Sequence, residues 1–477
     1  MMTFSISISL CGVRNFNSVF FTIAEINFRT PVFVWSAKFI SLFLLIFCGI
    51  HSALRAQTLD SLLAEAMRNN PQLRAYSFTV QAAEHRIDAA GALPPPQAGV
   101  AVEQVQVGNF NIVNGALSNN FYASQMFMLG GKLGAMQDME RARVKNEQDR
   151  TKEFAAKLRS DITTAYTMLW RIDRQREIYA STATVLERSI EVASSQVQAG
   201  RFSYAEVLRL QAEKSLALLK QTTIGNERKT AIAMLAALVG RTSTASFDVV
   251  PVLAERRFTE IQARERLQAL AVLNPTLKRM ASMIAMTEAE RVSVEKEATP
   301  DVMVQGMIMR MPQGMTLTAN STLFTGALES PFAYIIRAPN APPDFMYSLM
   351  AQVTLPFAPW SSAKYTAKAQ ELAAITQAQT LERESMTLML SAQMEEQLQK
   401  MHTATQTAEI LESTVIPLYE RTFDAQLAGL QSGQTSISGL LDTERMLLMK
   451  RDDVLMAREQ YHLALAQLEF LLGEPLR

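Results

Sequence analysis

The chain is poor in residues that interrupt or cross-link a protein. Its 477 residues include only 19 glycines, 17 prolines and 2 cysteines. Few glycines and prolines favour long uninterrupted elements, because these residues are the strongest breakers of regular structure. Both cysteines, Cys11 and Cys48, lie in or before an apolar leader, so the predicted mature chain has no thiol. Disulfides, cysteine metal sites and cysteine nucleophiles are therefore excluded from it.

The chain also lacks an excess of charge of one sign. It has 46 basic and 46 acidic residues, whereas nucleic-acid-binding proteins usually carry a basic surplus. Its four histidines are scattered, and it contains no phosphate loop, dinucleotide-binding fingerprint or Gly-x-Ser-x-Gly elbow. We therefore expect neither an enzyme nor a bound cofactor.

Residues 1–56 resemble a secretory signal. Lys38 precedes the apolar run 39–47, and small residues follow up to Ala56. This pattern predicts cleavage near Ala56-Gln57. The alternative is an uncleaved anchor, for which the apolar run is short. No comparably apolar helix follows, so we expect an exported chain that is either soluble or part of a β-barrel.

A heptad pattern marks the first long helical hairpin. Apolar or small residues recur in steps of three and four at Ile162, Ala165, Leu169, Ile172, Tyr179, Ala183, Leu186, Ile190, Ala193 and Val197. This spacing predicts a helix over 134–198 with a partner along its whole length. At about 1.5 Å per residue such a helix is on the order of 100 Å long. Gly200 should end it, and Ser203 with Glu206 should form a capping box for the next helix.

Alternating residues predict two β-hairpins. Val100 and Val102 alternate with smaller or polar residues, and a second strand candidate covers 121–128. Later, 302–309 and 346–355 alternate in the same way, the latter most clearly. We expect hairpins at about 98–128 and 301–357.

Landmarks recur in order, which indicates an internal duplication. Asn70-Pro71 recurs 204 residues later as Asn274-Pro275, and Gly200 recurs 233 residues later as Gly433. A repeat of this length fixes the architecture. The predicted first repeat covers 57–257, with its long helical hairpin at 134–240. The predicted second repeat covers 258–477, with its hairpin at 362–473 and a kink at Pro417.

Four strands of about ten residues have membrane-crossing length, but they cannot close a barrel by themselves. An open sheet in lipid would leave backbone groups unpaired. If the strands lie in a membrane, copies must combine, so that two would give eight strands and three would give twelve.

The ordered landmarks resemble the TolC-type outer membrane efflux proteins. The resemblance rests on the duplicated Asn-Pro-x-Leu helix, Leu129-Gly130-Gly131-Lys132, and the stretch 198–208. It implies a mainly α chain that forms a homotrimer, with a twelve-stranded β-barrel in the outer membrane and a periplasmic α-helical tunnel. It also implies that the helical tips meet a periplasmic adaptor protein and an inner-membrane pump, and that the duct is passive.

The resemblance also implies sites at the tips. Family members often narrow the entrance with two aspartates three residues apart, which here read Gly439 and Asp442, with Glu206 after the first tip. The alternative is that Asp442 simply pairs with Arg445 or Lys450. The predicted adaptor-contact turns consist of Gly200, Arg201, Ser203, Tyr204, Gly433 and Thr435. A plain capped turn is the alternative there.

Methionine is abundant, with 26 residues. Met303, Met307 and Met309 cluster on the third predicted strand, and thioether sulfur suits soft metal ions such as Cu(I). The alternative is that methionine fills lipid-facing or loop positions as a flexible apolar side chain.

Three functions follow from these observations. The first is the outer-membrane duct of a tripartite efflux system for small molecules or metal ions. The second is the duct of a type I protein secretion system. The third, from a different class, is a periplasmic coiled-coil scaffold without a pore, for which paired ten-residue strands would have no use.

Overall fold

The computed structural model describes residues 58–105, 107–108, 110–111, 113–242, 247, 249–253, 272–312, 315–318, 334–337, 342–432 and 434–476, with only the backbone of 315–318 and 334–337. The chain divides into two units, 1–56 and 57–477, and all described residues belong to the second. The predicted signal peptide therefore lies outside the described residues, as does most of the short helix expected at 267–273.

Most of the described chain is helical. The helices are α2 (Leu59–Asn69), α3 (Pro71–Gly91), α4 (Lys132–Gln198), α5 (Tyr204–Val239), α7 (Pro275–Glu297), α8 (Pro359–Ile410), α9 (Ile416–Ser432) and α10 (Ile437–Leu472), with a π-turn at Leu411–Val415. Within the described ranges, no helix is long and apolar enough to cross a bilayer.

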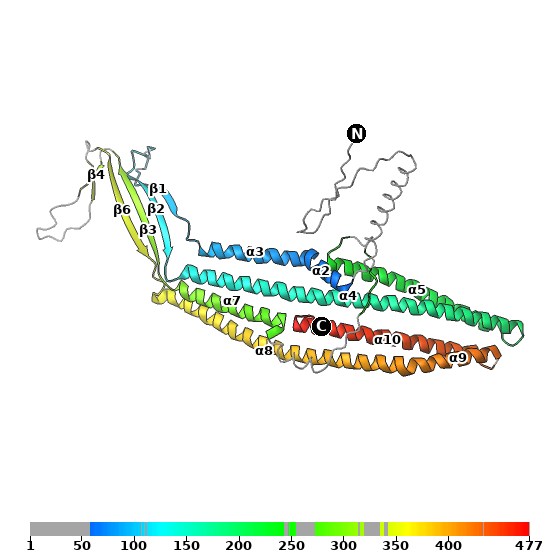
Figure 1. Cartoon of the computed structure of the whole chain (residues 1–477). Coiled ribbons are helices and arrows are strands. Elements are labelled where there is room, and N and C mark those ends of the chain that lie inside the picture. The colour runs from blue at the N-terminus through cyan, green and yellow to red at the C-terminus, as the bar shows by residue number, and fades with distance from the viewer. Residues whose placement is uncertain are drawn as a thin grey trace, which may run out of the picture. The chain divides into compact units, whose positions relative to one another are not determined.

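The long helices lie side by side and their two turns lie at one end, away from the sheet (Figure 1). Helix α4 packs along α3, α5, α7 and α10, and α8 packs along α7 and α10. Its 67 residues make α4 about 100 Å long, as the heptads predict. It begins at Lys132, two residues earlier than expected, because Gly131 adopts a left-handed conformation (φ 77°) and turns the chain into the helix.

An asparagine joins each repeat's short helices to the end of its long hairpin. Asn70 caps α3 by accepting hydrogen bonds from the N–H groups of Gln72 and Leu73, both 3.0 Å. Its Nδ2 donates to the carbonyl of Leu238 near the end of α5, at 2.8 Å. One side chain therefore satisfies free backbone groups at two helix ends.

Asn274 repeats this arrangement in the second half. Its Oδ1 accepts from the N–H of Leu277 at 2.9 Å, and its Nδ2 donates to the carbonyl of Leu471 at 2.7 Å. The duplication read from the sequence is thus present as a duplicated set of contacts.

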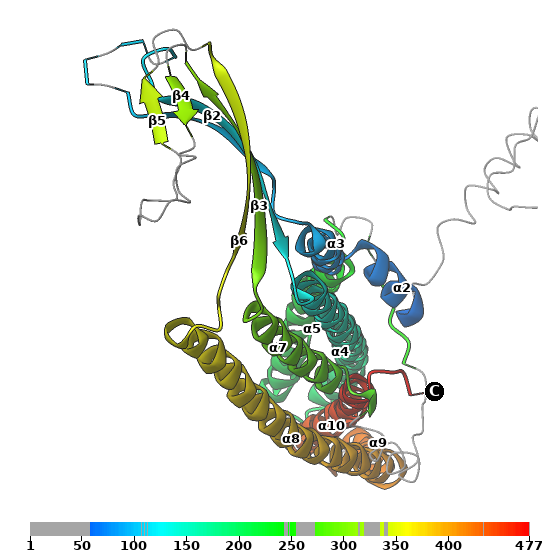
Figure 2. The same ribbon diagram turned by 90° about the vertical axis from the view of Figure 1, so that its left-hand side faces the viewer.

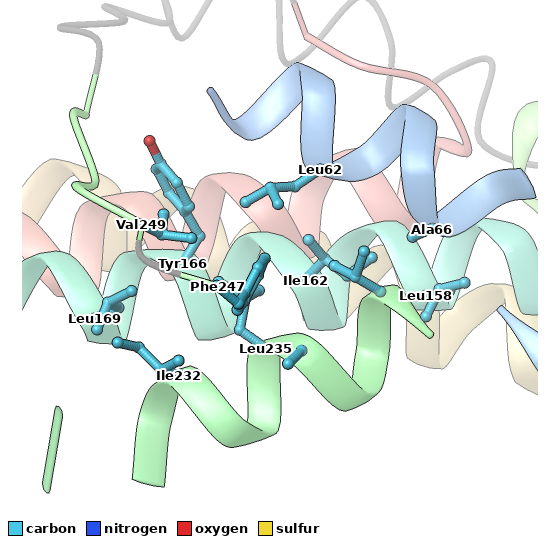
Figure 3. Close-up of a cluster of buried hydrophobic side chains, with 12 residues drawn as sticks. Leu62, Ala66, Leu158, Ile162, Tyr166, Leu169, Ile232, Leu235, Phe247 and Val249 are labelled. Atoms are coloured by element: carbon cyan, nitrogen blue, oxygen red, sulfur yellow. The ribbon is translucent and has the colours of Figure 1, made fainter. Parts of the chain in front are cut away.

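A core joins α2, α4, α5 and the connector that follows α5 (Figure 3). Tyr166 is almost fully buried in it, and its hydroxyl accepts a hydrogen bond from the N–H of Val252 at 3.0 Å. Phe247 and Val249 of the connector are buried beside it. Burial of aromatic and aliphatic surface here fixes the connector against the helices.

The second long helix is interrupted near Pro417. A π-turn, Leu411–Val415, separates α8 from α9, so the predicted irregularity is present just upstream of the proline. Pro417 has no N–H, and its ring would clash with the carbonyl of Ser413 in a regular α-helix. The wider turn relieves that clash. Helix α8 starts at Pro359, slightly before the expected 362, because proline suits the first helical position.

The strands form a four-stranded antiparallel sheet in the order β1-β2-β3-β6. These strands are β1 (Gln97–Glu103), β2 (Ser118–Met128), β3 (Asp301–Met311) and β6 (Asp344–Val353). The predicted hairpins are both present, and β2 pairs with β3 to join the repeats. Figure 2 shows β2, β3 and β6 extending from one end of the helices. A small pair, β4 (Met315–Thr318) with β5 (Tyr334–Arg337), was not expected from the sequence.

Candidate functional site

The first helical turn is built by a glycine. Gly200 has φ 72°, a conformation that glycine adopts without strain. The N–H of Arg201 bonds to the carbonyl of Gln196 at 3.0 Å and that of Gly200 to Val197 at 2.9 Å. These two bonds are a Schellman motif, which ends α4 sharply.

Ser203 caps the next helix, although not as a capping box. Its Oγ accepts from the N–H of Ala205 at 3.3 Å, whereas a capping box requires the N–H of Glu206. The N–H of Glu206 bonds instead to the backbone carbonyl of Ser203 at 3.1 Å. The predicted capping box of Ser203 with Glu206 is therefore wrong, and the cap does not depend on the Glu206 carboxylate.

Two side chains of this turn face outward. Arg201 is exposed, and Tyr204 is 62% exposed. Phe202, between them, instead packs into the cluster that holds the hairpin ends together. An exposed tyrosine beside an exposed arginine is typical of binding surfaces, where these residue types often dominate the affinity.

The second turn lies against the first. Gln196 donates from Nε2 to the carbonyl of Gln431 at 2.8 Å, and buried Leu430 and Ile437 share a cluster with α4 and α5. Gly433 lies outside the described residues. The N–H of Thr435 bonds to the carbonyl of Gly429 at 3.3 Å. The two predicted contact turns thus form one continuous end of the described molecule.

Asp442 and Glu206 lie on different helices near these turns. The side chain of Asp442 is 74% exposed and lies 3.8 Å from Arg445, the pairing that we weighed as the alternative. Arg445 also bonds to Glu213 on α5. An exposed pair of this kind contributes little to stability. Lys450, the other weighed partner, pairs with Asp453 at 2.8 Å.

Buried polar residues between α4 and α10 were missed by our sequence reasoning. Glu444 is buried, and that burial raises the pKa of its carboxyl group, against the smaller opposing effects of the Thr182 hydroxyl and of Arg451. Glu459, whose pKa is also raised by burial, pairs with Arg171 at 2.9 Å. For Glu444 the available signal was its position on the heptad face of α10, beside Leu447, where a charge is unexpected.

The two faces of the sheet differ in chemistry. One face, which we name the apolar face, carries Val100, Val102, Phe121, Phe127, Val302, Val304, Ile308, Phe345, Tyr347, Leu349 and Val353. Several of these are largely exposed, including Tyr347 at 90% and Leu349 at 77%. A contiguous exposed apolar surface of this kind marks contact with lipid or another apolar partner.

The opposite face, which we name the methionine face, carries the predicted Met303, Met307 and Met309. They share it with Met126, Met128, Met311, Met346 and Met350. The structure therefore brings the three sequence-predicted methionines together on one face. Groups of three or more His, Cys, Asp or Glu side chains that could hold a metal are absent from the described part of the chain.

An ion pair closes the junction between sheet and helices. Lys132, the first residue of α4, lies 2.8 Å from Asp301, the first residue of β3, and both side chains are largely buried. A Cβ added at Gly130 would lie 2.5 Å from the hydroxyl of Thr299, and that hydroxyl donates to the carbonyl of Leu129 at 3.2 Å. The Gly-Gly-Lys stretch thus joins the two repeats.

Comparison with known proteins agrees with this geometry. A family model described as "Outer membrane efflux protein" matches residues 62–241 and 267–474. Among curated proteins, no sequence matches this chain.

Solved structures share the fold at low sequence identity. VceC from Vibrio cholerae is 14% identical, with a TM-score of 0.68 over 88% of this chain and 97% of VceC. CusC is 16% identical, with a TM-score of 0.67 over 88% and 93% of the two chains. CmeC from Campylobacter jejuni is 10% identical, with a TM-score of 0.66 over 87% and 85%. The chain belongs to the outer membrane efflux protein family and is accordingly an outer-membrane efflux channel, not an enzyme.

Proposed function

We propose that the chain works as a homotrimer whose copies each add four strands to a twelve-stranded barrel in the outer membrane. The open sheet carries this proposal. Its edge strands, β1 and β6, each have one ladder neighbour in the described sheet, and its apolar face is exposed. Unpaired backbone groups at strand edges are energetically unfavourable in lipid, and pairing with the edge strands of other copies would satisfy them.

The helices then form a periplasmic tunnel, and the duct is a passive component of a tripartite efflux system for small molecules or metal ions. At the tips, Arg201 and Tyr204 contact a periplasmic adaptor protein that works with an inner-membrane pump. Gly200, Ser203, Gly433 and Thr435 shape the turns that present this surface. The Schellman turn at Gly200 and the exposure of Tyr204 support this role.

Asp442 and Glu206 line the entrance of this duct. Three copies of an exposed carboxylate around one axis would attract cations and repel anions. The exposure of Asp442 and its weak pairing with Arg445 support this assignment.

Protein export by a type I secretion system would use the same duct, because the inner-membrane partner selects the cargo. The scaffold without a pore disagrees with the family assignment and has no use for a sheet with an exposed apolar face.

Single-channel conductance in planar bilayers tests the duct, together with the cross-linked mass of the purified protein. We expect trimers with discrete conductance and cation selectivity. Asp442→Ala should reduce that selectivity, whereas the matched change Asp138→Ala, also at an exposed and paired aspartate but on α4, should not. Monomers that never insert would contradict the duct. Conducting trimers with selectivity unchanged by Asp442→Ala would leave the duct intact and remove the entrance residue.

A further inference from the structure

Methionine is strictly segregated in the sheet. The four strands hold eight methionines, two on β2, four on β3 and two on β6, and the pairing registers place all eight on the methionine face. The valines, isoleucine, leucine, phenylalanines and Tyr347 of these strands lie on the apolar face. If methionine served only as apolar filler, it would be expected among those residues, since it is equally at home in apolar surroundings.

The methionine face is otherwise polar, and its charges are all acidic. Its other members include Asn120, Ser124, Gln305, Ser348 and Gln352. The charged side chains that the four strands place on this face are Glu103, Asp301 and Asp344, with no lysine or arginine among them. Arg310 lies on the other face. Lys132 neutralises Asp301 in the ion pair described above, so Glu103 and Asp344 carry the remaining negative charge of this face, which draws in cations.

The registers gather the methionines into two groups of three. In the first group, Met303 lies directly opposite Met126 on β2, and Met350 on β6 is its diagonal neighbour. In the second group, Met309 lies directly opposite Met346, with Met307 two residues away on the same face of β3. Opposed side chains have Cβ atoms about 5 Å apart and diagonal ones about 7 Å apart. Three flexible thioethers can converge over such distances.

We propose that these two groups bind a soft monovalent cation, Cu(I) or its redox-inert analogue Ag(I), through thioether sulfur. Soft cations prefer sulfur ligands, and thioethers are neutral, so each site holds the ion without the very high affinity of thiolates. This inference rests on the proposed function only in placing the methionine face toward the duct. There, two successive weak sites would let an ion enter, pass from one group to the other and leave.

Ag(I) binding to the purified full-length trimer tests the proposal by equilibrium dialysis, with bound silver measured by mass spectrometry and the methionine methyl groups followed by NMR. We expect saturable binding with methyl shifts confined to the two groups. The triple change Met126→Leu, Met303→Leu and Met350→Leu should weaken binding at the first group at least tenfold. The change Met307→Leu, Met309→Leu and Met346→Leu should do the same at the second group. Leucine keeps the apolar volume and removes only the sulfur.

The matched control changes three exposed methionines on helices, Met389→Leu, Met446→Leu and Met449→Leu, and should leave sheet binding intact. Silver that does not bind, or binds equally to the sheet variants, would overturn the proposal. The proposal would also be overturned if a lipophilic organic cation bound equally to all variants while silver did not bind, because the methionine face would then bind apolar cargo instead of soft metal ions. Conductance measured on the same proteins separates the two proposals: conducting trimers without silver binding refute the metal site alone, and silver-binding protein that never conducts refutes the duct alone.

Discussion

The two repeats of the chain are alike at their ends and different in their middles. Asn70 and Asn274 make the same bonds to the ends of α5 and α10, at 2.8 Å and 2.7 Å. Helix α4 runs for 67 residues without a break, whereas the matching segment of the second repeat is split by the π-turn before Pro417. The repeats therefore agree where backbone groups must be satisfied at a helix junction. They differ in the middle of the long helices, where a helix tolerates a local irregularity such as the π-turn.

The junction glycines, together with the capping asparagines, give the largest expected differences between the repeats. Gly240 has φ 88°, and an added Cβ would lie 2.7 Å from the backbone oxygen of Asn69. Gly473 has φ 72°, and its added Cβ would lie 2.9 Å from the Pro275 ring and 3.1 Å from the backbone oxygen of Leu273, so its closest backbone contact is less severe. We expect Gly240→Ala to lower the free energy of unfolding by about 3 kcal/mol, and Gly473→Ala by about 2 kcal/mol. Thermal unfolding in detergent measures both, and equal losses would remove this distinction.

The capping asparagines test whether the two junctions contribute equally. Asn274 is fully buried and Asn70 is 7% exposed. Asn274→Ala should cost about 3 kcal/mol, because it removes a cap and leaves the carbonyl of Leu471 buried without its partner. Asn70→Ala should cost about 2 kcal/mol, since water can reach the vacated groups. A larger loss at Asn70, measured by denaturant unfolding, would reverse the ranking.

Acid should act on the two repeats with opposite sign. The hydrogen bond from Arg241 lowers the pKa of Glu65 below 4.5, so the stability contributed by this carboxylate is present above pH 4.5 and lost as the pH falls through the lowered pKa. Burial raises the pKa of Glu444 above 4.5, so the folded state binds the extra proton and stability falls as the pH rises from 4.5 through the raised pKa.

Unfolding temperatures of Glu65→Gln and Glu444→Gln, measured from pH 3 to pH 8, check these signs. Glu444→Gln should be more stable than the parent at neutral pH, with the difference vanishing in acid. Glu65→Gln should be less stable at neutral pH, with the difference shrinking in acid. Parallel profiles for parent and variants would contradict both assignments.

The π-turn gives the smallest effect. Pro417→Ala restores an N–H and removes the ring, so we expect about 1 kcal/mol of stabilisation and slower hydrogen exchange over 411–417. The gain is smaller than for a proline in a regular helix because the π-turn already accommodates the ring. Pro275→Ala, at the first position of α7, is the control and should not stabilise. Faster exchange in Pro417→Ala would show that the proline itself holds the turn.

Much of this fold could be predicted from periodicity. The heptads of 162–197 and the alternation of 346–355 predict their elements because one face of each is buried or apolar. The β4–β5 pair was not predicted because strands of four residues are too short to show a recognisable alternation of apolar and polar residues. Strand registers could not be predicted either, and only they show that Met126 and Met346 belong with Met303 and Met309. The burial of Glu444 was not predicted for another reason. The heptad pattern identifies the buried face of a helix by its apolar residues, and a charged residue on that face does not fit the pattern.

The pairing of β2 with β3 has a consequence for how the molecule is made. Ser124 pairs with Gln305, so the centre of the sheet joins segments separated by most of the first repeat. Contacts this distant in sequence form slowly, because the entropy cost of closing a long loop precedes any stabilisation by the contacts. The helical hairpins, which need only neighbours in sequence, can form first. The apolar face is then completed last, when the whole chain has been exported. This order limits the time for which an exposed apolar surface is in contact with water before it reaches the membrane.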